Sequence, residues 1–223
     1  MRSSKEPRSG GGGNRRVWIA VGAAVLVLVA IGGGIALAMG GGDDSPSAGA
    51  IGDACDVQTF EALAQDHVPP SKLPEGFKYN SYPPSSGPHY PDPLIFGEYS
   101  TALEQNRLLH NLEHGGVGVQ YGSNVSAETI AELTAWYRND PRGLVLAPLP
   151  QDPRAAKYAD SIVLTAWVAD RDDPTDPAEE PTKQTGVLAT CSGFNEGAFD
   201  SFIDDYRGHG PELFTLDQLA PGF

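Results

Sequence analysis

The sequence predicts an α+β domain with a single small, mostly antiparallel sheet and packed helices, preceded by one transmembrane helix. Two observations lead to this prediction. Residues 17–39 form an uncharged apolar stretch, and amphipathic segments then alternate with short runs of β-branched and aliphatic residues. These segments follow the order helix, loop, helix, strand, helix, strand, strand, helix, which favours helices packed against an antiparallel sheet.

The apolar stretch Val17–Met39 is long enough, at about 1.5 Å per residue, to cross a hydrocarbon core of about 30 Å. Five basic residues and one acidic residue precede it. The positive-inside rule therefore predicts a single-pass protein of the cell membrane, with a cytoplasmic N-terminus and an external C-terminal domain. A signal peptide cleaved after Ala38 is the alternative, although the apolar region of a signal peptide usually has only about 7–15 residues.

The predicted anchor divides the chain into a basic cytoplasmic tail, the transmembrane helix, a flexible linker and an extracytoplasmic α+β domain, which are residues 1–16, 17–39, 40–52 and 53–223. Residues 40–223 contain ten basic and 28 acidic residues, a formal net charge of −18. Such a surface repels nucleic acid and anionic lipid headgroups. We therefore expect contact with the membrane through residues 17–39 alone, and no nucleic-acid partner.

The only two cysteines, Cys55 and Cys191, both lie in the predicted external domain. An oxidising compartment favours a disulfide between them. In the chain-entropy model, closing so long a loop stabilises a fold by about 4–5 kcal/mol. Unbridged or metal-bound thiols are the alternative, because the sequence does not give the distance between the two residues.

Four helices are expected where apolar residues recur at intervals of three or four. They cover residues 56–67, residues 102–114, a segment that begins at Ser126, and residues 196–206. The hydroxyl of Ser126 can accept a backbone hydrogen bond at the start of its helix. Pro141 ends the same helix because proline has no backbone donor.

Three strands are expected in runs of aliphatic, β-branched and aromatic residues, at residues 117–121, 144–149 and 161–168. Two loops are expected as well. Five prolines between residues 79 and 93 exclude regular structure, and this proline-rich loop either presents His89 in a fixed geometry or covers the core with its tyrosines. Residues 170–182 are acidic and proline-rich, and bury too little apolar surface to order themselves.

The segment Leu-Leu-His-Asn-Leu-Glu-His-Gly-Gly, residues 108–116, is the best candidate for chemistry. On a helix its leucines share a face that can be buried, whereas its two histidines and its carboxylate share another. The polar face consists of His110, Glu113 and His114. Gly115 is expected to end the helix in the left-handed conformation typical of a C-cap.

Two imidazoles at positions i and i+4 of a helix project to the same side and can bind one cation. We therefore expect a transition metal, zinc or copper(II), held by His110 and His114, with His89 of the proline-rich loop as the third ligand. Glu113 is expected to act as a ligand, as a hydrogen-bond partner that fixes an imidazole tautomer, or as a general base.

The C-terminal residues His209 and Glu212 are expected to contact these ligands from outside. His67 has the least support of the five histidines. Without a metal, the same residues would form a polar network. His114 would alternatively do no more than complement the dipole at the C-terminus of its helix.

Three functions are compatible with these residues. The first is a membrane-anchored external domain that binds a transition metal. The second is a metal-free protein-interaction module of the cell envelope, with the proline-rich loop as its contact surface through Tyr82 and Tyr90. The third is a zinc-dependent hydrolase, since His110-x-x-Glu113-His114 has the form of an inverted zinc-protease motif. A helix that ends at Gly115 departs from that motif. The sequence therefore leaves open whether the chain is an enzyme.

Four short motifs behind the N-terminal anchor resemble the family called domain of unknown function 3105. They are Tyr79-Asn80-Ser81, Pro83-Pro84-x-Ser86-Gly87-Pro88-His89, His110-Asn111-Leu112-Glu113-His114-Gly115 and Leu164-Thr165-Ala166-Trp167. The resemblance covers most of the predicted external domain. It implies a membrane-associated, exported bacterial domain and supplies no accepted activity, so no catalytic role is transferred to any residue.

Overall fold

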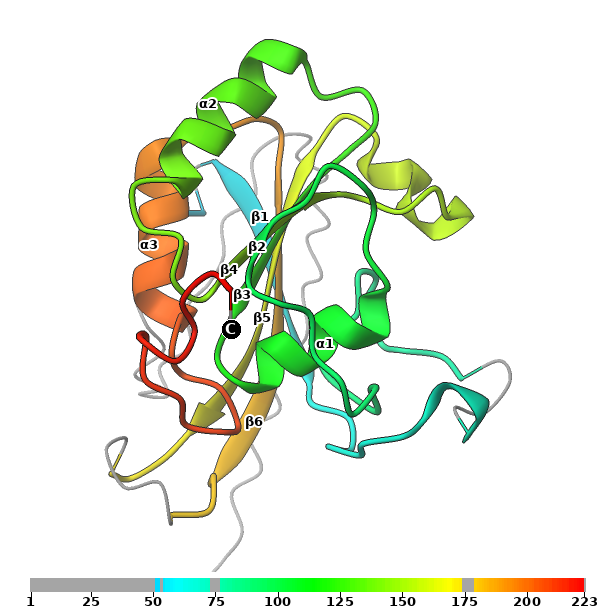
Figure 1. Cartoon of the computed structure of the whole chain (residues 1–223), viewed down its shortest axis with the longest axis vertical. Coiled ribbons are helices and arrows are strands. Elements are labelled where there is room, and N and C mark those ends of the chain that lie inside the picture. The colour runs from blue at the N-terminus through cyan, green and yellow to red at the C-terminus, as the bar shows by residue number, and fades with distance from the viewer. Residues whose placement is uncertain (1–50, 53, 73–76, 174–178, 223) are drawn as a thin grey trace, which may run out of the picture. The chain divides into compact units, whose positions relative to one another are not determined.

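The computed structural model describes residues 51–222 except 53, 73–76 and 174–178 (Figure 1). Within these residues, no helix has both the length and the apolar character needed to cross a membrane. The transmembrane helix expected at residues 17–39 lies outside the described part of the chain, as do the cytoplasmic tail and most of the linker.

The domain contains one six-stranded sheet with the strand order β1-β6-β5-β3-β4-β2. Its strands are β1 (Cys55–Glu61), β2 (Gly97–Glu98), β3 (Val117–Tyr121), β4 (Leu144–Pro148), β5 (Ile162–Asp170) and β6 (Lys183–Cys191). The helices are α1 (Gln105–Glu113), α2 (Ala127–Tyr137) and α3 (Glu196–Tyr206), with short 3-10 helices η1 (Pro70–Lys72) and η2 (Pro153–Tyr158). The predicted α+β class is therefore confirmed.

The sheet is mixed, with three antiparallel and two parallel strand pairs, so the predicted antiparallel pairing describes most of the sheet but not all of it. Strand β6 runs antiparallel to both of its neighbours, β1 and β5, and β5 runs antiparallel to β3. Strand β4, however, is parallel to both β3 and β2. The parallel pairing of β3 with β4 follows from helix α2, which lies between them in sequence and returns the chain to the same end of the sheet.

Helices cover both faces of this sheet, with α2 and α3 on one face and α1 on the other (Figure 1). Strand β5 shows the division, because successive side chains point to opposite faces of a strand. Ile162 and Leu164 pack in the cluster that includes α2 and α3, whereas Trp167 packs in the cluster that includes α1. Burial on both faces explains why β5 is almost continuously apolar.

The three later helices form where the sequence predicts them. The side chain of Ser126 accepts a hydrogen bond from the backbone N–H of Thr129, which confirms the N-cap of α2. Asn195 caps α3 in the same way through the N–H of Ala198. The strands expected at residues 117–121, 144–149 and 161–168 are likewise confirmed as β3, β4 and β5, within one or two residues.

The prediction of a helix at residues 56–67 is wrong. Strand β1 occupies the first half of this segment, and the chain then continues in extended form. Val57 and Phe60 were read as one helical face, but they contact different hydrophobic clusters on opposite faces of the sheet. Strand β6 was not assigned at all. It pairs with β1 over the full length of β1, and tertiary pairing of this kind overrides a short helical pattern.

A disulfide joins Cys55 to Cys191, as the sequence predicts. The two residues are paired directly across β1 and β6, at the N-terminus of one strand and the C-terminus of the other. Strand β1 lies at the edge of the sheet and has β6 as its one neighbour there. The covalent bond therefore fastens an edge strand at the point where its ladder would otherwise fray.

Candidate metal centre

Helix α1 carries the predicted polar face of histidines and a carboxylate. Its apolar face packs into the domain and holds the helix in place. Leu108, Leu109 and Leu112 are almost fully buried, in a cluster that includes Trp167 of β5. Asn111, between them, is also buried, and its side-chain amide both accepts from the backbone N–H of Leu94 and donates to the Leu94 carbonyl. These contacts fix the rotation of the helix, so that His110 and Glu113 point away from the leucine cluster.

The helix ends as predicted at Gly115, which has a φ of +86° and donates its N–H to the carbonyl of Leu112. The C-terminal segment then runs alongside this end of the helix. Gly208 donates to the Gly115 carbonyl at 2.8 Å, and Glu212 donates to the Glu113 carbonyl at 3.0 Å. A Cβ atom at Gly210 would lie 2.2 Å from the Gly115 nitrogen, so this close approach requires glycine.

The proline-rich loop is buried over most of its length and therefore belongs to the fold. Ser81 and residues 83–89 are all buried, whereas Tyr82 and Tyr90 are half-buried. Ser81 accepts from the Ser85 N–H and donates within the loop. Most of the loop therefore packs into the domain, while Tyr82 and Tyr90 keep part of their surface accessible.

His89 is positioned at the end of this loop by Tyr79. The Tyr79 hydroxyl donates to the carbonyl of Pro88, the residue directly before His89. Asn106 of α1 donates to the same hydroxyl at 2.6 Å. Burial raises the pKa of Tyr79 to about 12, so the hydroxyl keeps its proton and remains a donor at neutral pH.

His67 comes to the same place through a short ladder between two extended segments. The backbone of His67 forms a parallel bridge with that of His89. In this bridge the Val68 N–H donates to the His89 carbonyl at 2.7 Å, and the His89 N–H donates to the Asp66 carbonyl at 3.0 Å. The two imidazole rings consequently lie side by side, with centroids 4.7 Å apart.

Three imidazoles converge on one oxygen of Glu113. The Nε2 atoms of His67 and His89 each lie 2.9 Å from Glu113 Oε2, and the Nε2 atom of His110 lies 3.7 Å from it. His89 and Glu113 are inaccessible to solvent, at 0% and 1% exposure, while the side chain of His67 is 42% exposed. The group is therefore a buried cluster with one side open at His67.

The other ring nitrogens decide the protonation state of this cluster. Nδ1 of His89 lies 2.8 Å from the carbonyl oxygen of Gly87, and Nδ1 of His110 lies 2.8 Å from that of Tyr90. A carbonyl oxygen only accepts, so each Nδ1 carries a hydrogen. In a neutral ring the lone pair is then on Nε2, the atom that faces the carboxylate. Two acceptors at 2.9 Å require a cation between them, which is either an extra proton or a metal ion.

Burial and hydrogen bonding act on the pKa of Glu113 in opposite directions. Burial raises it, but the hydrogen bond and charge of His89 and the hydrogen bond of His67 outweigh burial and lower the pKa to about 2. Burial lowers the pKa of His110, and burial together with the charge of His110 lowers the pKa of His114 to about 4. At neutral pH the centre thus offers an ionised carboxylate and neutral imidazoles at His110 and His114, the forms that bind metal.

His114 and Glu212 form a second group beside the first. Nε2 of His114 lies 3.1 Å from Nε2 of His110 and 3.2 Å from Oε2 of Glu212. The imidazole of His114 stacks on Phe214, with centroids 4.2 Å apart. Among the residues that the structure describes, two groups are geometrically able to hold an ion: His67, His89, His110 and Glu113, and Glu113, His114 and Glu212.

The structure thus brings His89, His110 and Glu113 together, as the sequence predicts, and adds His67 to them. His114 belongs to the second group, with Glu212, instead of completing the first. His209 is exposed and belongs to neither group. His67 was overlooked because the segment before it was read as a helix. The signal for an extended path was the Pro69-Pro70 pair, since the residue before a proline is driven out of the helical region.

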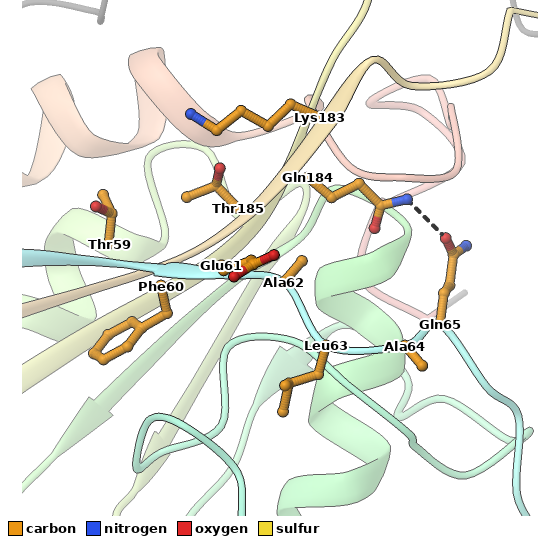
Figure 2. Close-up of a pocket in the computed structure, with 10 residues that line it drawn as sticks. All are labelled: Thr59, Phe60, Glu61, Ala62, Leu63, Ala64, Gln65, Lys183, Gln184 and Thr185. Carbon is orange, nitrogen blue, oxygen red and sulfur yellow. Dashed lines mark hydrogen bonds between the residues drawn. The ribbon is translucent and has the colours of Figure 1, made fainter.

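A groove with a volume of about 700 Å³ lies where β1 ends and β6 begins (Figure 2). None of the histidines lines it, so it is separate from the cluster. Gln184 of β6 reaches across it to Gln65 at 3.1 Å, and Trp167 donates to the same Gln184 side chain. Gln65 in turn contributes a hydrogen bond that lowers the pKa of Glu113. Gln65 at the groove therefore helps to keep Glu113 ionised.

Replacing Tyr79 by Phe is expected to lower the free energy of unfolding by about 1–2 kcal/mol, because the Pro88 carbonyl loses a donor and Asn106 an acceptor. Urea denaturation measures the change. Tyr99→Phe is the matched control, since its hydroxyl bonds the Ile95 carbonyl at an exposed position and should change stability by less than about 0.5 kcal/mol. Equal losses in the two variants would contradict a positioning role for Tyr79.

Comparison with known proteins identifies a family and leaves its chemistry open. No curated protein and no solved structure matches this chain. The sequence profile of one family matches residues 72–216, which include His89, the whole of α1 and the residues after it as far as Glu212. His67 lies just before the matched range. The chain belongs to the family described as protein of unknown function (DUF3105).

Proposed function

We propose that this protein is a membrane-anchored external domain that binds a transition metal through His67, His89, His110 and Glu113. The observation that carries the proposal is the convergence of three Nε2 atoms on Glu113 Oε2, with the Nδ1 atoms of two of the rings engaged by backbone carbonyls. Metal-bound histidines typically donate the N–H of their other ring nitrogen to such an acceptor. This hydrogen bond fixes the tautomer and directs the lone pair of the ligating nitrogen towards the metal.

The spacing of the four ligand atoms suits a small divalent ion. They lie within 4.8 Å of one another. Zinc binds imidazole nitrogen and carboxylate oxygen at about 2.0–2.2 Å, so neighbouring ligands of a tetrahedral ion are about 3.3 Å apart. The separations of 2.9 and 3.7 Å from Glu113 Oε2 lie on either side of this value. Three nitrogens and one oxygen favour zinc or copper(II) over calcium or magnesium.

Four protein ligands would fill a tetrahedral zinc ion, which is the arrangement of a site that holds its metal rather than one that keeps a position free for substrate. This favours metal binding over the zinc-dependent hydrolase at these four residues. The anchor is proposed from the uncharged stretch 17–39 and the basic residues before it. Alkaline extraction of cell membranes tests it, since a spanning chain stays in the pellet and a peripheral one is released.

Elemental analysis of the full-length chain, purified in detergent and equilibrated with zinc or copper(II), tests the metal proposal. We expect tightly held metal in the wild type and its loss in the double variant His89→Ala, His110→Ala. The single variant His67→Ala is expected to weaken metal binding at least tenfold. Losing even a residue that only hydrogen-bonds to a metal ligand typically lowers metal affinity by about this factor, and losing a ligand should lower it as much or more. His67 is largely exposed, so this variant should fold normally.

His209→Ala is the matched control, because His209 is exposed and outside both groups. It should bind as much metal as the wild type. Equal and negligible metal in all four proteins would refute the proposal and leave a proton-bridged polar network in its place. Unchanged affinity in His67→Ala would instead show that the ligand set is wrong.

A further inference from the structure

A single ion at the first cluster leaves His114 and Glu212 without a role, although they form a second group with Glu113 of that cluster. Their ligand atoms also lie within 4.8 Å of one another. Glu113 belongs to both groups, and a carboxylate has two oxygens with which to contact two ions. Resting on the proposed function, we propose that these three residues form a second cation position, joined to the first through a bridging Glu113.

The hydrogen bonding around His114 supports this position. Nε2 of His114 lies between Nε2 of His110, at 3.1 Å, and Oε2 of Glu212, at 3.2 Å. Because Nδ1 of His110 donates to the Tyr90 carbonyl, Nε2 of His110 is an acceptor in the neutral ring, and Glu212 is an acceptor too. Nε2 of His114 carries either one hydrogen or one lone pair and cannot serve both neighbours, so at least one of these close contacts lacks a matched donor and acceptor. A metal ion bound to His114 and Glu212 removes that conflict.

The backbone around Glu212 holds the carboxylate in this position. Its N–H donates to the Glu113 carbonyl, and Gly208 is tied to the Gly115 carbonyl in the same way. Glycine at position 210 allows this approach to the end of α1. The ring of His114 is stacked on Phe214, which belongs to the same C-terminal segment. The end of α1 and the C-terminal segment are therefore held against each other, and together they carry one imidazole and two carboxylates.

The two positions would differ in chemistry. One nitrogen and two carboxylates form a harder ligand set than three nitrogens and one carboxylate, so the second position suits zinc, manganese or cobalt as divalent ions. It offers three protein groups instead of four, and Glu212 is 40% exposed. Coordination sites would remain free for water or an anionic substrate, which is the arrangement of catalytic metal sites. A shared carboxylate is compatible with the spacing of about 3.5–4 Å seen in two-metal enzymes.

The full-length chain, stripped of metal and equilibrated with zinc, tests this proposal by its stoichiometry. We expect two zinc ions per chain in the wild type and one in Glu212→Gln and in His114→Gln. Glu132→Gln, an exposed carboxylate on α2 outside both groups, is the matched control and should keep two. Loading with copper(II) adds a readout of adjacency, because two copper ions a few ångströms apart couple magnetically and lose the resonance signal of isolated ions.

The outcomes separate the two proposals. One ion in the wild type, retained in Glu212→Gln and lost in His89→Ala, would overturn the second position and leave the first. Two ions in both the wild type and Glu212→Gln, or two ions without magnetic coupling, would place the second ion elsewhere and also overturn it. No ion in the wild type would remove both proposals. Thermal unfolding of each variant without metal shows whether its fold is intact.

Discussion

Replacing Cys55 and Cys191 together by alanine is expected to lower the free energy of unfolding by about 4–5 kcal/mol. The disulfide closes a loop with a sequence separation of 136 residues, and the chain-entropy model gives a loop of this length a stabilisation of this size. The loss is large beside the roughly 5–15 kcal/mol by which a typical domain is stable. Urea denaturation of the metal-free protein measures it.

The same variant tests how the edge strand supports the site. Strand β1 has β6 as its one neighbour in the sheet, and the chain leaves β1 to reach His67 only six residues after Glu61. We expect faster hydrogen exchange in β1 than in β5, and weaker metal binding through His67, because the segment loses its covalent fastening. Replacing both cysteines avoids a free thiol. A loss below about 1 kcal/mol would contradict the entropic account and indicate an unfolded state that is already compact.

Helices were predictable from sequence wherever a complete apolar face coincided with an end signal. For α2 the N-cap Ser126 and the terminating Pro141 bracket a face that includes Leu133 and Trp136, and the structure reproduces it. The end of α1 at Gly115, the left-handed residue after the C-cap His114, was predictable for the same reason, since left-handed backbone favours glycine. Such signals are local, and every residue involved lies within one or two turns.

Strand pairing was harder to predict because it depends on residues far apart in the chain. The apolar residues of β1 are few and fit a helical spacing as well as a strand. What makes the segment a strand is its pairing with β6, more than 120 residues later in the sequence. The disulfide was the one long-range restraint in the sequence, and it does place Cys55 beside Cys191.

The residues of the candidate site also differ in whether local sequence signals or long-range pairing place them. His110 and Glu113 share one helix, so their common face follows from a period of 3.6 residues. His89 was predictable in kind, as a histidine on a stiff loop, although its distance from α1 was not. His67 depends on a ladder between two non-helical segments, for which no sequence period exists. His114 has the i and i+4 spacing to His110 that gives both side chains a shared direction, and the structure groups it with Glu113 and Glu212.

Replacing Glu113 by Gln is expected to remove a pH-dependent part of the stability, measured in the presence of a chelator. The carboxylate has its pKa lowered from 4.5 to about 2 in the fold, where burial is outweighed by the hydrogen bond and charge of His89 and the hydrogen bond of His67. A lowered carboxyl pKa means that the folded state favours the ionised form. At about 1.4 kcal/mol per pKa unit, the difference contributes about 3 kcal/mol at neutral pH.

The sign of the effect fixes the pH window. Because the folded pKa lies below the unfolded one, the contribution is fully present above about pH 5 and is lost as the pH falls towards 2. Wild-type stability should therefore fall more steeply than that of Glu113→Gln between these limits, and the two curves should converge at the acid end. Urea denaturation at a series of pH values measures both curves.

A matched carboxylate on the surface separates this effect from general acid destabilisation. Glu132→Gln removes an exposed charge on α2 and should give a curve parallel to that of the wild type. Zinc adds a second test, since an ion that binds the folded state alone raises its stability by mass action. Zinc should stabilise the wild type at pH 7 and leave Glu113→Gln unchanged. A variant that zinc stabilises as strongly as the wild type would show that Glu113 holds the histidines without contacting the ion.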